Sequence, residues 1–288
     1  MRGAGSLCVV IDEAILLDGA SEPDRRSDAV AGGSVVAFTC RSPDKETQNE
    51  DSVAVVPYGP QSAVLIVADG AGGLPAGKRA SLAAVSTLVD ALQASTDKTL
   101  LMRTTILDAI EAANAAVMDL GNGSATTLTV ITIEGLSTRA YQIGDSEAVV
   151  VGQRGCIKLQ TTPHSPTGFA VEAGFLDQRE ALHHAERHLV SNFLGTSDMR
   201  IDIGTEVILK PRDTIMLASD GLMDNVHFDE IIGRIRKGPL DDAANKVISL
   251  AQKRMTGACA GQPSKPDDLS LILFRKAYAG RAVPGRDM

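Results

Sequence analysis

Apolar and polar residues form blocks along this chain, and the blocks predict strands and helices in turn. Short runs rich in β-branched residues predict strands, whereas apolar residues spaced three or four positions apart predict amphipathic helices. The predicted strands cover 34–40, 52–58, 62–68, 126–133, 138–143, 148–153, 156–159, 207–209, 214–218 and 269–274. The predicted helices cover 77–95, 102–120, two short helices within 168–188, 227–237 and 240–255.

The order of these blocks bears on the fold class. Strands do not alternate singly with helices, which argues against a doubly wound parallel sheet. Strand blocks separated by helix pairs favour an α+β fold of four layers, in which helices cover the outer faces of antiparallel sheets.

The ends of the chain differ in composition from its middle. Residues 18–33 are polar and rich in Gly, Ser and Asp, and are predicted to be a loop. We find no internal repeat and no strong linker, and therefore expect one compact domain over 34–276. An extension at 1–33 would precede it, partly loop, with an edge strand through 7–10 as one option. A tail at 277–288 would follow.

Composition narrows the class of protein. Hydrophobic residues make up 44% of the 288 residues but aromatic residues only 3%, so the core must consist of Ala, Val, Leu and Ile. The net charge of -8 argues against a nucleic-acid binder and is compatible with carboxylates around divalent cations. The four cysteines are scattered, without a C-x-x-C pair, which favours free thiols in a reducing cytoplasm. No apolar run approaches membrane-spanning length, and we expect no membrane association.

One stretch of the sequence contains residues that could bind a metal ion. The aliphatic run at 64–68 ends in Asp69, and a glycine-rich turn at 70–73 follows at once. The run predicts a buried strand, and glycines allow backbone turns and close approaches that other residues forbid. Asp69 and a turn carbonyl could therefore bind a metal ion. An ordinary Asp-Gly turn is the simpler alternative; a phosphate-binding loop is the other, but the Lys-Ser/Thr pair of a P-loop is missing.

Further acids occupy the same kind of position, at the margin of a predicted strand. They are Glu50, Asp51, Asp145, Asp220, Asp267 and Asp268. A single Asp at a strand end is most often a turn or cap residue, but five such margins could converge at one edge of the sheets. Mg²⁺ and Mn²⁺ prefer oxygen ligands of this kind, and two such ions can activate a water and bind a phosphoryl group.

The motifs around these acids resemble those of the metal-dependent Ser/Thr protein phosphatases of type 2C, in their bacterial form. The resemblance runs from about residue 34 to residue 275. Seven blocks occur in the family's order, at 49–52, 67–73, 125–128, 143–146, 171–174, 217–222 and 267–270. The resemblance implies an α-β-β-α sandwich of two antiparallel sheets flanked by helix pairs, which agrees with the block order.

The resemblance also implies roles for single residues. Asp69 would bridge two Mn²⁺ or Mg²⁺ ions, and the Gly70 carbonyl would bind one of them. Asp220 and Asp267 would complete the site of the first ion.

Three more acids would take part. Glu50 would hold water on the second ion, with Asp51 beside it. Asp145 would help Asp220 to hold a third, weaker ion. A metal-bridging water or hydroxide would then attack phosphorus directly, without a covalent enzyme intermediate.

The chain also departs from the family pattern. The Arg that grips the substrate phosphate is replaced by Glu46, a carboxylate that would repel phosphate. Arg41 or Lys45 could supply the cation instead; the alternative is that neither does and the affinity for phosphate falls. The predicted catalytic residues are Asp69, Asp51 and Arg41. Ala71 stands where animal members often have a His, which leaves water as the expected proton donor. Milder departures lie at Glu147, at Pro163 before His164, at Asn192 and at Asp268.

We therefore expect a cytoplasmic, monomeric serine/threonine protein phosphatase that acts on a phosphorylated protein. A Ser/Thr kinase or its targets are the expected partners, and nucleic acids and membranes are not. The alternative is a pseudo-phosphatase, which has the same fold but acts as a binding or regulatory module. Retention of Asp69, Asp220 and Asp267 favours the enzyme, and Glu46 favours the alternative.

Overall fold

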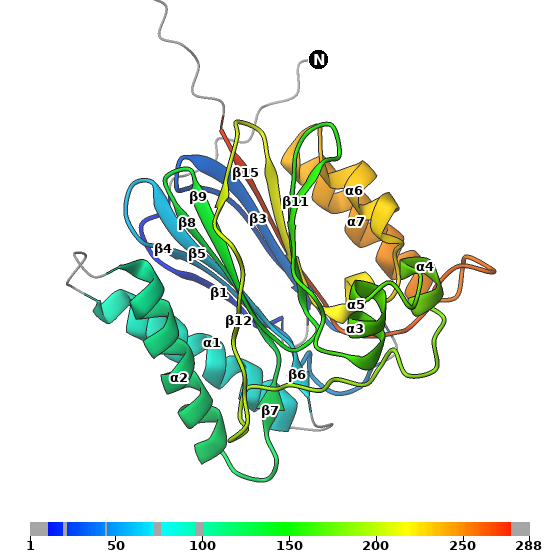
Figure 1. Cartoon of the computed structure of the whole chain (residues 1–288), viewed down its shortest axis with the longest axis horizontal. Helices are drawn as coiled ribbons and strands as arrows, with labels where there is room; N and C mark the ends of the chain where they lie inside the picture. The colour runs from blue at the N-terminus through cyan, green and yellow to red at the C-terminus, as the bar shows by residue number, and fades with distance from the viewer. Residues whose placement is uncertain (1–10, 20–21, 44, 72–75, 96–100, 278–288) are drawn as a thin grey trace, which may run out of the picture.

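A computed structural model describes residues 11–19, 22–43, 45–71, 76–95 and 101–277. Over these residues the chain forms two large antiparallel sheets that pack face to face (Figure 1). One sheet has the order β1-β4-β5-β8-β9-β12, with β13 also paired to β9, and the other has the order β11-β10-β14-β15-β3-β2. Their strands are β1 (Ile15–Leu17), β2 (Asp24–Val30), β3 (Gly33–Cys40), β4 (Ser52–Pro57), β5 (Ser62–Ala68), β8 (Leu128–Glu134), β9 (Ser137–Ile143), β10 (Glu147–Val151), β11 (Ile157–Gln160), β12 (Asp202–Ile203), β13 (Val207–Ile208), β14 (Thr214–Ala218) and β15 (Leu269–Lys276).

Helix pairs cover the outer faces of both sheets, as Figure 1 shows. Helices α1 (Ala76–Ala94) and α2 (Met102–Asp119) pack on the sheet that contains β5. Helices α6 (Phe228–Ile235) and α7 (Leu240–Met255) pack on the sheet that contains β15. The predicted four-layer α-β-β-α sandwich is therefore confirmed.

The central strands show why their sequences are apolar without interruption. On β5, Val64 and Ile66 face helices α1 and α2, whereas Leu65 and Val67 face the opposite sheet. Both faces of such a strand are buried, so both sets of alternating side chains must be apolar. The strand predicted at 62–68 has these same bounds in the structure.

Short elements stand at one edge of the sandwich. Strands β6 (Gly70–Ala71) and β7 (Ala125–Thr126) form a small sheet of their own. Helices α3 (Pro166–Glu172) and α4 (Gln178–Ala181) form a flap after β11, and α5 (Asp220–Met223) follows β14. Among the described residues, no helix has both the length and the apolar character needed to cross a bilayer.

The prediction of a loop over 18–33 is wrong for β2. This strand pairs with β3 along its whole length, from Asp24 opposite Thr39 to Val30 opposite Gly33. It lies at the edge of its sheet and is only partly buried, so polar side chains are tolerated while backbone hydrogen bonds hold it. Strand β1 likewise pairs with β4, so part of the predicted extension belongs to the sheets. The predicted strand at 7–10 and the tail from 278 lie outside the described residues.

Candidate metal centre

The predicted site residues come together at one edge of the two sheets. They lie before β4, after β5, between β9 and β10, after β14 and before β15. The residues are Glu50, Asp51, Asp69, Gly70, Asp145, Asp220 and Asp267. Burial, and then the charges of Asp51, Asp220, Asp267 and Asp145, raise the pKa of Asp69 well above its usual range. The fold therefore brings the acids near enough to repel one another strongly.

The backbone of Asp69 is fixed by two consecutive threonines. The Asp69 N–H donates to Thr127 Oγ1 at 3.0 Å. The Asp69 carbonyl accepts from the Thr127 N–H and from Thr126 Oγ1, each at 2.8 Å. These bonds explain why the Thr-Thr pair at 126–127 accompanies the Asp-Gly turn. The end of that turn, at 72–73, lies outside the described residues.

Two glycines allow a carboxylate and a carbonyl to lie close together. A Cβ atom on Gly77 would lie 2.5 Å from Glu50 Oε1 and 2.7 Å from the Gly70 carbonyl oxygen. A Cβ atom on Gly70 would lie 2.2 Å from the Gly77 carbonyl oxygen. A side chain at either position would push these groups apart. The result is a pair of oxygen donors of the kind that hard divalent cations bind.

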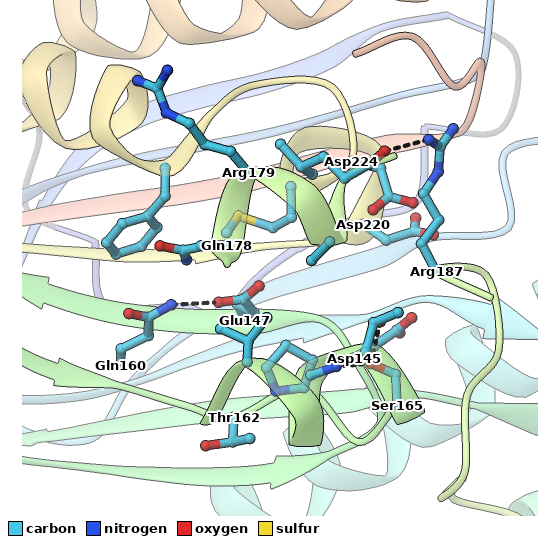
Figure 2. Close-up of a pocket in the computed structure, with 18 of the residues that line it drawn as sticks. Asp145, Glu147, Gln160, Thr162, Ser165, Gln178, Arg179, Arg187, Asp220 and Asp224 are labelled. Atoms are coloured by element: carbon cyan, nitrogen blue, oxygen red, sulfur yellow. Dashed lines mark hydrogen bonds between the residues drawn. The ribbon is translucent and has the colours of Figure 1, made fainter. Parts of the chain in front are cut away.

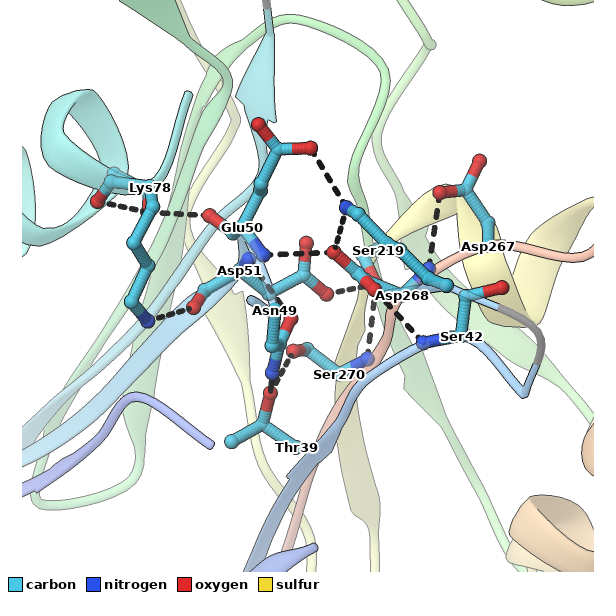
Figure 3. Close-up of polar contacts among 12 residues, drawn as sticks. Thr39, Ser42, Asn49, Glu50, Asp51, Lys78, Ser219, Asp267, Asp268 and Ser270 are labelled. Carbon is cyan, nitrogen blue, oxygen red and sulfur yellow. Dashed lines mark hydrogen bonds and ion pairs between the residues drawn. The ribbon is translucent and has the colours of Figure 1, made fainter. Parts of the chain in front are cut away.

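Asp51 is the most deeply buried of the acids, with no exposed surface. Its Oδ2 atom accepts a hydrogen bond from Ser219 Oγ at 2.8 Å (Figure 3). Burial, and then the charges of Asp268 and Asp220, raise the pKa of Asp51 to about 8. Burial and the charge of Asp220 also raise the pKa of Asp267, to about 7. These acids therefore resist ionising together unless cations lie among them.

Buried oxygens without partners indicate where a cation would fit. Glu50 Oε1, Asp51 Oδ1 and Asp220 Oδ1 have no hydrogen-bond partner among the described residues, which is unfavourable for buried charged oxygens. In the part of the chain that the structure describes, no three acidic, imidazole or thiol groups already stand in metal-binding positions. The carboxylates would therefore have to turn toward a bound ion. Their all-oxygen donor set fits Mg²⁺ or Mn²⁺.

Two lysine ammonium groups lie among the acids. Lys45 Nζ is 2.7 Å from Glu50 Oε2 and 2.6 Å from Asp268 Oδ2. Lys265 Nζ contacts a second set of acids, beginning with Asp220 Oδ2 at 2.5 Å. Of the two predicted phosphate-binding cations, the fold places Lys45 in the site; Arg41 forms no ion pair with any described acid.

A cavity of about 490 Å³ adjoins the acids, between the flap helices and α5 (Figure 2). Asp145, Asp220 and Asp224 lie at one end of it. Glu147 lies in its wall and accepts a hydrogen bond from Gln160 Nε2 at 3.2 Å. Burial raises the pKa of Glu147 to about 7. The cavity is thus a space beside the acids that a substrate could enter.

The sequence motifs did not predict two residues of this site, Asp224 and Lys265. Asp224 stands four residues after Asp220, at the C-cap of α5, and this i, i+4 spacing was a signal that could have revealed it. Lys265 offered no such signal, because its position at the site depends on how the loop before β15 folds back onto α5.

A family profile described as Protein phosphatase 2C matches residues 43–250. The chain belongs to the protein phosphatase 2C family.

Individual relatives agree with this assignment. A Streptococcus pyogenes protein named for the 2C type of phosphatase is 32% identical over 148 residues, which are 49% of this chain and 59% of that protein. Protein phosphatase PhpP of Streptococcus pneumoniae is 30% identical over 131 residues, or 45% of this chain and 52% of that protein. The matched region thus spans little more than half the length of these relatives.

Solved structures extend the similarity over most of the chain. The Streptococcus agalactiae serine/threonine phosphatase has a TM-score of 0.71 and 27% identity, and the match covers 84% of this chain and 98% of that one. The catalytic domain of the phosphatase PstP, solved in complex with two manganese ions, has a TM-score of 0.65 and 25% identity, with coverage of 91% and 98%.

In this phosphatase 2C family member, Asp268 is one of the departures from the family pattern and has a clear structural role. It is 3% exposed. Its carboxylate accepts the N–H groups of Ser42 at 2.8 Å and Glu50 at 2.7 Å, in addition to Lys45 (Figure 3). Asp268 therefore fastens the loop before β4 and holds the Lys45 ammonium at the site.

Asn192, another departure from the family pattern, contacts His164. His164 Nδ1 lies 2.8 Å from Asn192 Nδ2 and accepts the Gly144 N–H at 3.1 Å. Because Nδ1 is an acceptor, His164 Nε2 donates to Asp202 at 3.0 Å. The pair thus fixes the turn that carries Asp145.

Proposed function

We propose that this chain is a Mn²⁺- or Mg²⁺-dependent serine/threonine protein phosphatase that hydrolyses phosphoserine and phosphothreonine in a protein substrate. The observation that carries the proposal is the cluster of acids at one sheet edge, in which three carboxylates have buried oxygens without a partner among the residues that the structure describes. Membership of a metal-dependent phosphatase family supports it. So does a structural neighbour solved with two manganese ions.

The site offers distinct groups for two ions. Asp69 would be shared between them, Asp220 and Asp267 would hold one, and Glu50 and the Gly70 carbonyl would complete the set. Bound ions of this kind supply a hydroxide nucleophile at neutral pH and neutralise phosphoryl oxygens.

Buried groups around the ligands would control water at the site. Asp51 has one buried oxygen that no described residue contacts by a hydrogen bond, and this oxygen can accept a hydrogen bond from a water that reaches the cluster. Asp145 would extend the cluster toward the cavity. Ala71 provides no proton donor, so the leaving oxygen would take its proton from water.

Lys45 is the cation best placed to bind the substrate phosphate. It precedes Glu46, which is exposed, and its ammonium lies between Glu50 and Asp268. A charge-assisted hydrogen bond from Lys45 would orient the phosphate as a point charge, without the two-pronged grip of an Arg. Arg41 is the alternative cation.

Substrates and partners are proposed from the family. A phosphorylated protein is the substrate, and a Ser/Thr kinase, or the targets of one, is the proposed partner. A regulatory module without turnover is the second candidate, since Glu46 removes the family's Arg.

A Mn²⁺-dependence assay tests the proposal, with p-nitrophenyl phosphate and a phosphothreonine peptide as substrates. We expect turnover with Mn²⁺, none with EDTA, and a loss of at least about 100-fold in kcat for Asp69→Asn. Asp108→Asn, on the exposed face of α2, is the matched control and should keep full turnover. No metal-dependent turnover in the parent chain would support the regulatory module instead.

A further inference from the structure

Lys265 lies among three carboxylates, two from α5 and its C-cap and one from the loop that carries Lys265 itself. Its Nζ atom is 2.5 Å from Asp220 Oδ2, 2.8 Å from Asp224 Oδ2 and 3.3 Å from Asp267 Oδ2. The Lys265 side chain is only 21% exposed. A single ammonium therefore serves as the counter-ion of three acids, two of which are proposed metal ligands.

The backbone around Lys265 is anchored, so this position is built into the fold. The Lys265 N–H donates to Asn225 Oδ1 at 2.7 Å, and the Asn225 Nδ2 group donates to the Lys265 carbonyl at 2.8 Å. Asn225 itself is fully buried and also donates to the Gly221 carbonyl of α5 at 2.8 Å. This two-way amide contact fixes Lys265 against the helix that begins with Asp220.

The two oxygens of Asp220 have different surroundings. Oδ2 pairs with Lys265, whereas Oδ1 is buried and has no partner in the described part of the chain. Asp220 can therefore keep its contact with Lys265 and still offer Oδ1 to an ion held with Asp69 and Asp267. The side of Asp220 that faces Asp224 already has a cation, and Figure 2 shows Asp220 and Asp224 at the same end of the cavity as Asp145.

Asp145 belongs to the same neighbourhood. It lines the cavity together with Asp220 and Asp224, the two acids that pair with the ammonium of Lys265. A divalent ion shared by Asp145 and Asp220 would have to lie close to that ammonium. Two cations so close together repel each other, and the one attached to the chain cannot diffuse away.

We propose that Lys265 is a tethered cation that takes the place of a third metal ion at Asp145, Asp220 and Asp224. The chain then binds two divalent ions rather than three. This inference rests on the proposed metal-dependent function, because it assumes that the first two ions bind.

Counting bound Mn²⁺ tests the inference. Equilibrium dialysis with metal analysis, taken to millimolar free Mn²⁺, should give two ions per chain for the parent and three for Lys265→Met. Lys265→Arg retains the charge and should stay at two. The double variant Lys265→Met, Asp224→Asn should return to two, because the freed site loses a ligand.

Thermal unfolding in EDTA provides a second measurement. Lys265→Met should unfold at a lower temperature than the parent, since three acids lose their counter-ion, and Mn²⁺ should raise its midpoint more than it raises the parent's.

The outcomes separate this inference from the proposed function. Three ions in the parent, or two in Lys265→Met, would overturn the tethered cation and leave the phosphatase proposal intact. No Mn²⁺ bound to the parent would overturn both. The parent count needs no variant to fold, so the inference can fail on that measurement alone.

Discussion

Replacing Asp51 by Asn should stabilise the metal-free chain while abolishing turnover. The pKa of Asp51 is raised from 3.8 to about 8, first by burial and then by the charges of Asp268 and Asp220. At pH 7 the unfolded chain ionises this group, whereas the folded chain must keep it protonated. Because pH 7 lies about 3 pH units above the ordinary pKa of the group, keeping it protonated costs ~1.4 kcal/mol for each unit. The folding penalty is therefore about 4 kcal/mol.

Asn avoids that penalty because it is neutral and nearly the same shape. Asn would also weaken the hydrogen bond from Ser219, and this loss offsets about 1–2 kcal/mol of the gain in stability. We therefore expect a net gain of roughly 2 kcal/mol at pH 7, or about 4–8 °C in Tm for a chain of this size. Because the folded pKa of Asp51 is the higher one, the parent loses stability as pH rises from about 4 to 8. The gain should vanish near pH 4 and be complete above pH 8.

Thermal and urea unfolding in EDTA at several pH values would measure this effect. Asp213→Asn is the matched control: Asp213 is buried but paired with Lys158, and it accepts the Lys210 N–H at 2.6 Å, so its loss should destabilise the chain. Saturating Mn²⁺ should shrink the gain from Asp51→Asn, since bound ions offset the neighbouring charges. A variant no more stable than the parent at pH 8, or a gain equal at pH 4 and pH 8, would refute this account of the cluster.

Two further predictions concern the phosphate-binding cation and the close approach of α5. Lys45→Met should lower kcat/KM by about tenfold or more, and Lys45→Arg should restore most of it. Arg41→Ala should keep kcat/KM within about twofold of the parent value. A larger loss from Arg41→Ala than from Lys45→Met would make Arg41 the phosphate-binding cation. Gly221→Ala should cost about 1–3 kcal/mol or more in urea unfolding, because its Cβ would lie 1.9 Å from the Asp268 carbonyl oxygen. Gly233→Ala in α6, which has open space, should not destabilise the chain, and equal effects of the two changes would contradict the argument.

Much of the fold could be predicted because a buried strand or helix has a regular pattern of apolar residues in its own sequence. The bounds of β5 and α7 agree with their predicted ranges, since each has a regular apolar pattern set by the layers that cover it. The edge strand β2 has no such apolar pattern, because backbone pairing with β3 rather than apolar side chains holds it in place.

The sequence by itself determined which acids stand at strand ends, because an apolar run and the residue that ends it are neighbours in the chain. It did not determine which cations would meet those acids. Lys45 rather than Arg41 contacts Glu50, since Asp268, more than 200 residues away, holds its ammonium. Lys265 reaches Asp220 only because Asn225 fastens a distant loop to α5. Periodicity reports which side chains face the core, whereas ion pairs depend on where separate loops meet, and only the tertiary structure decides that.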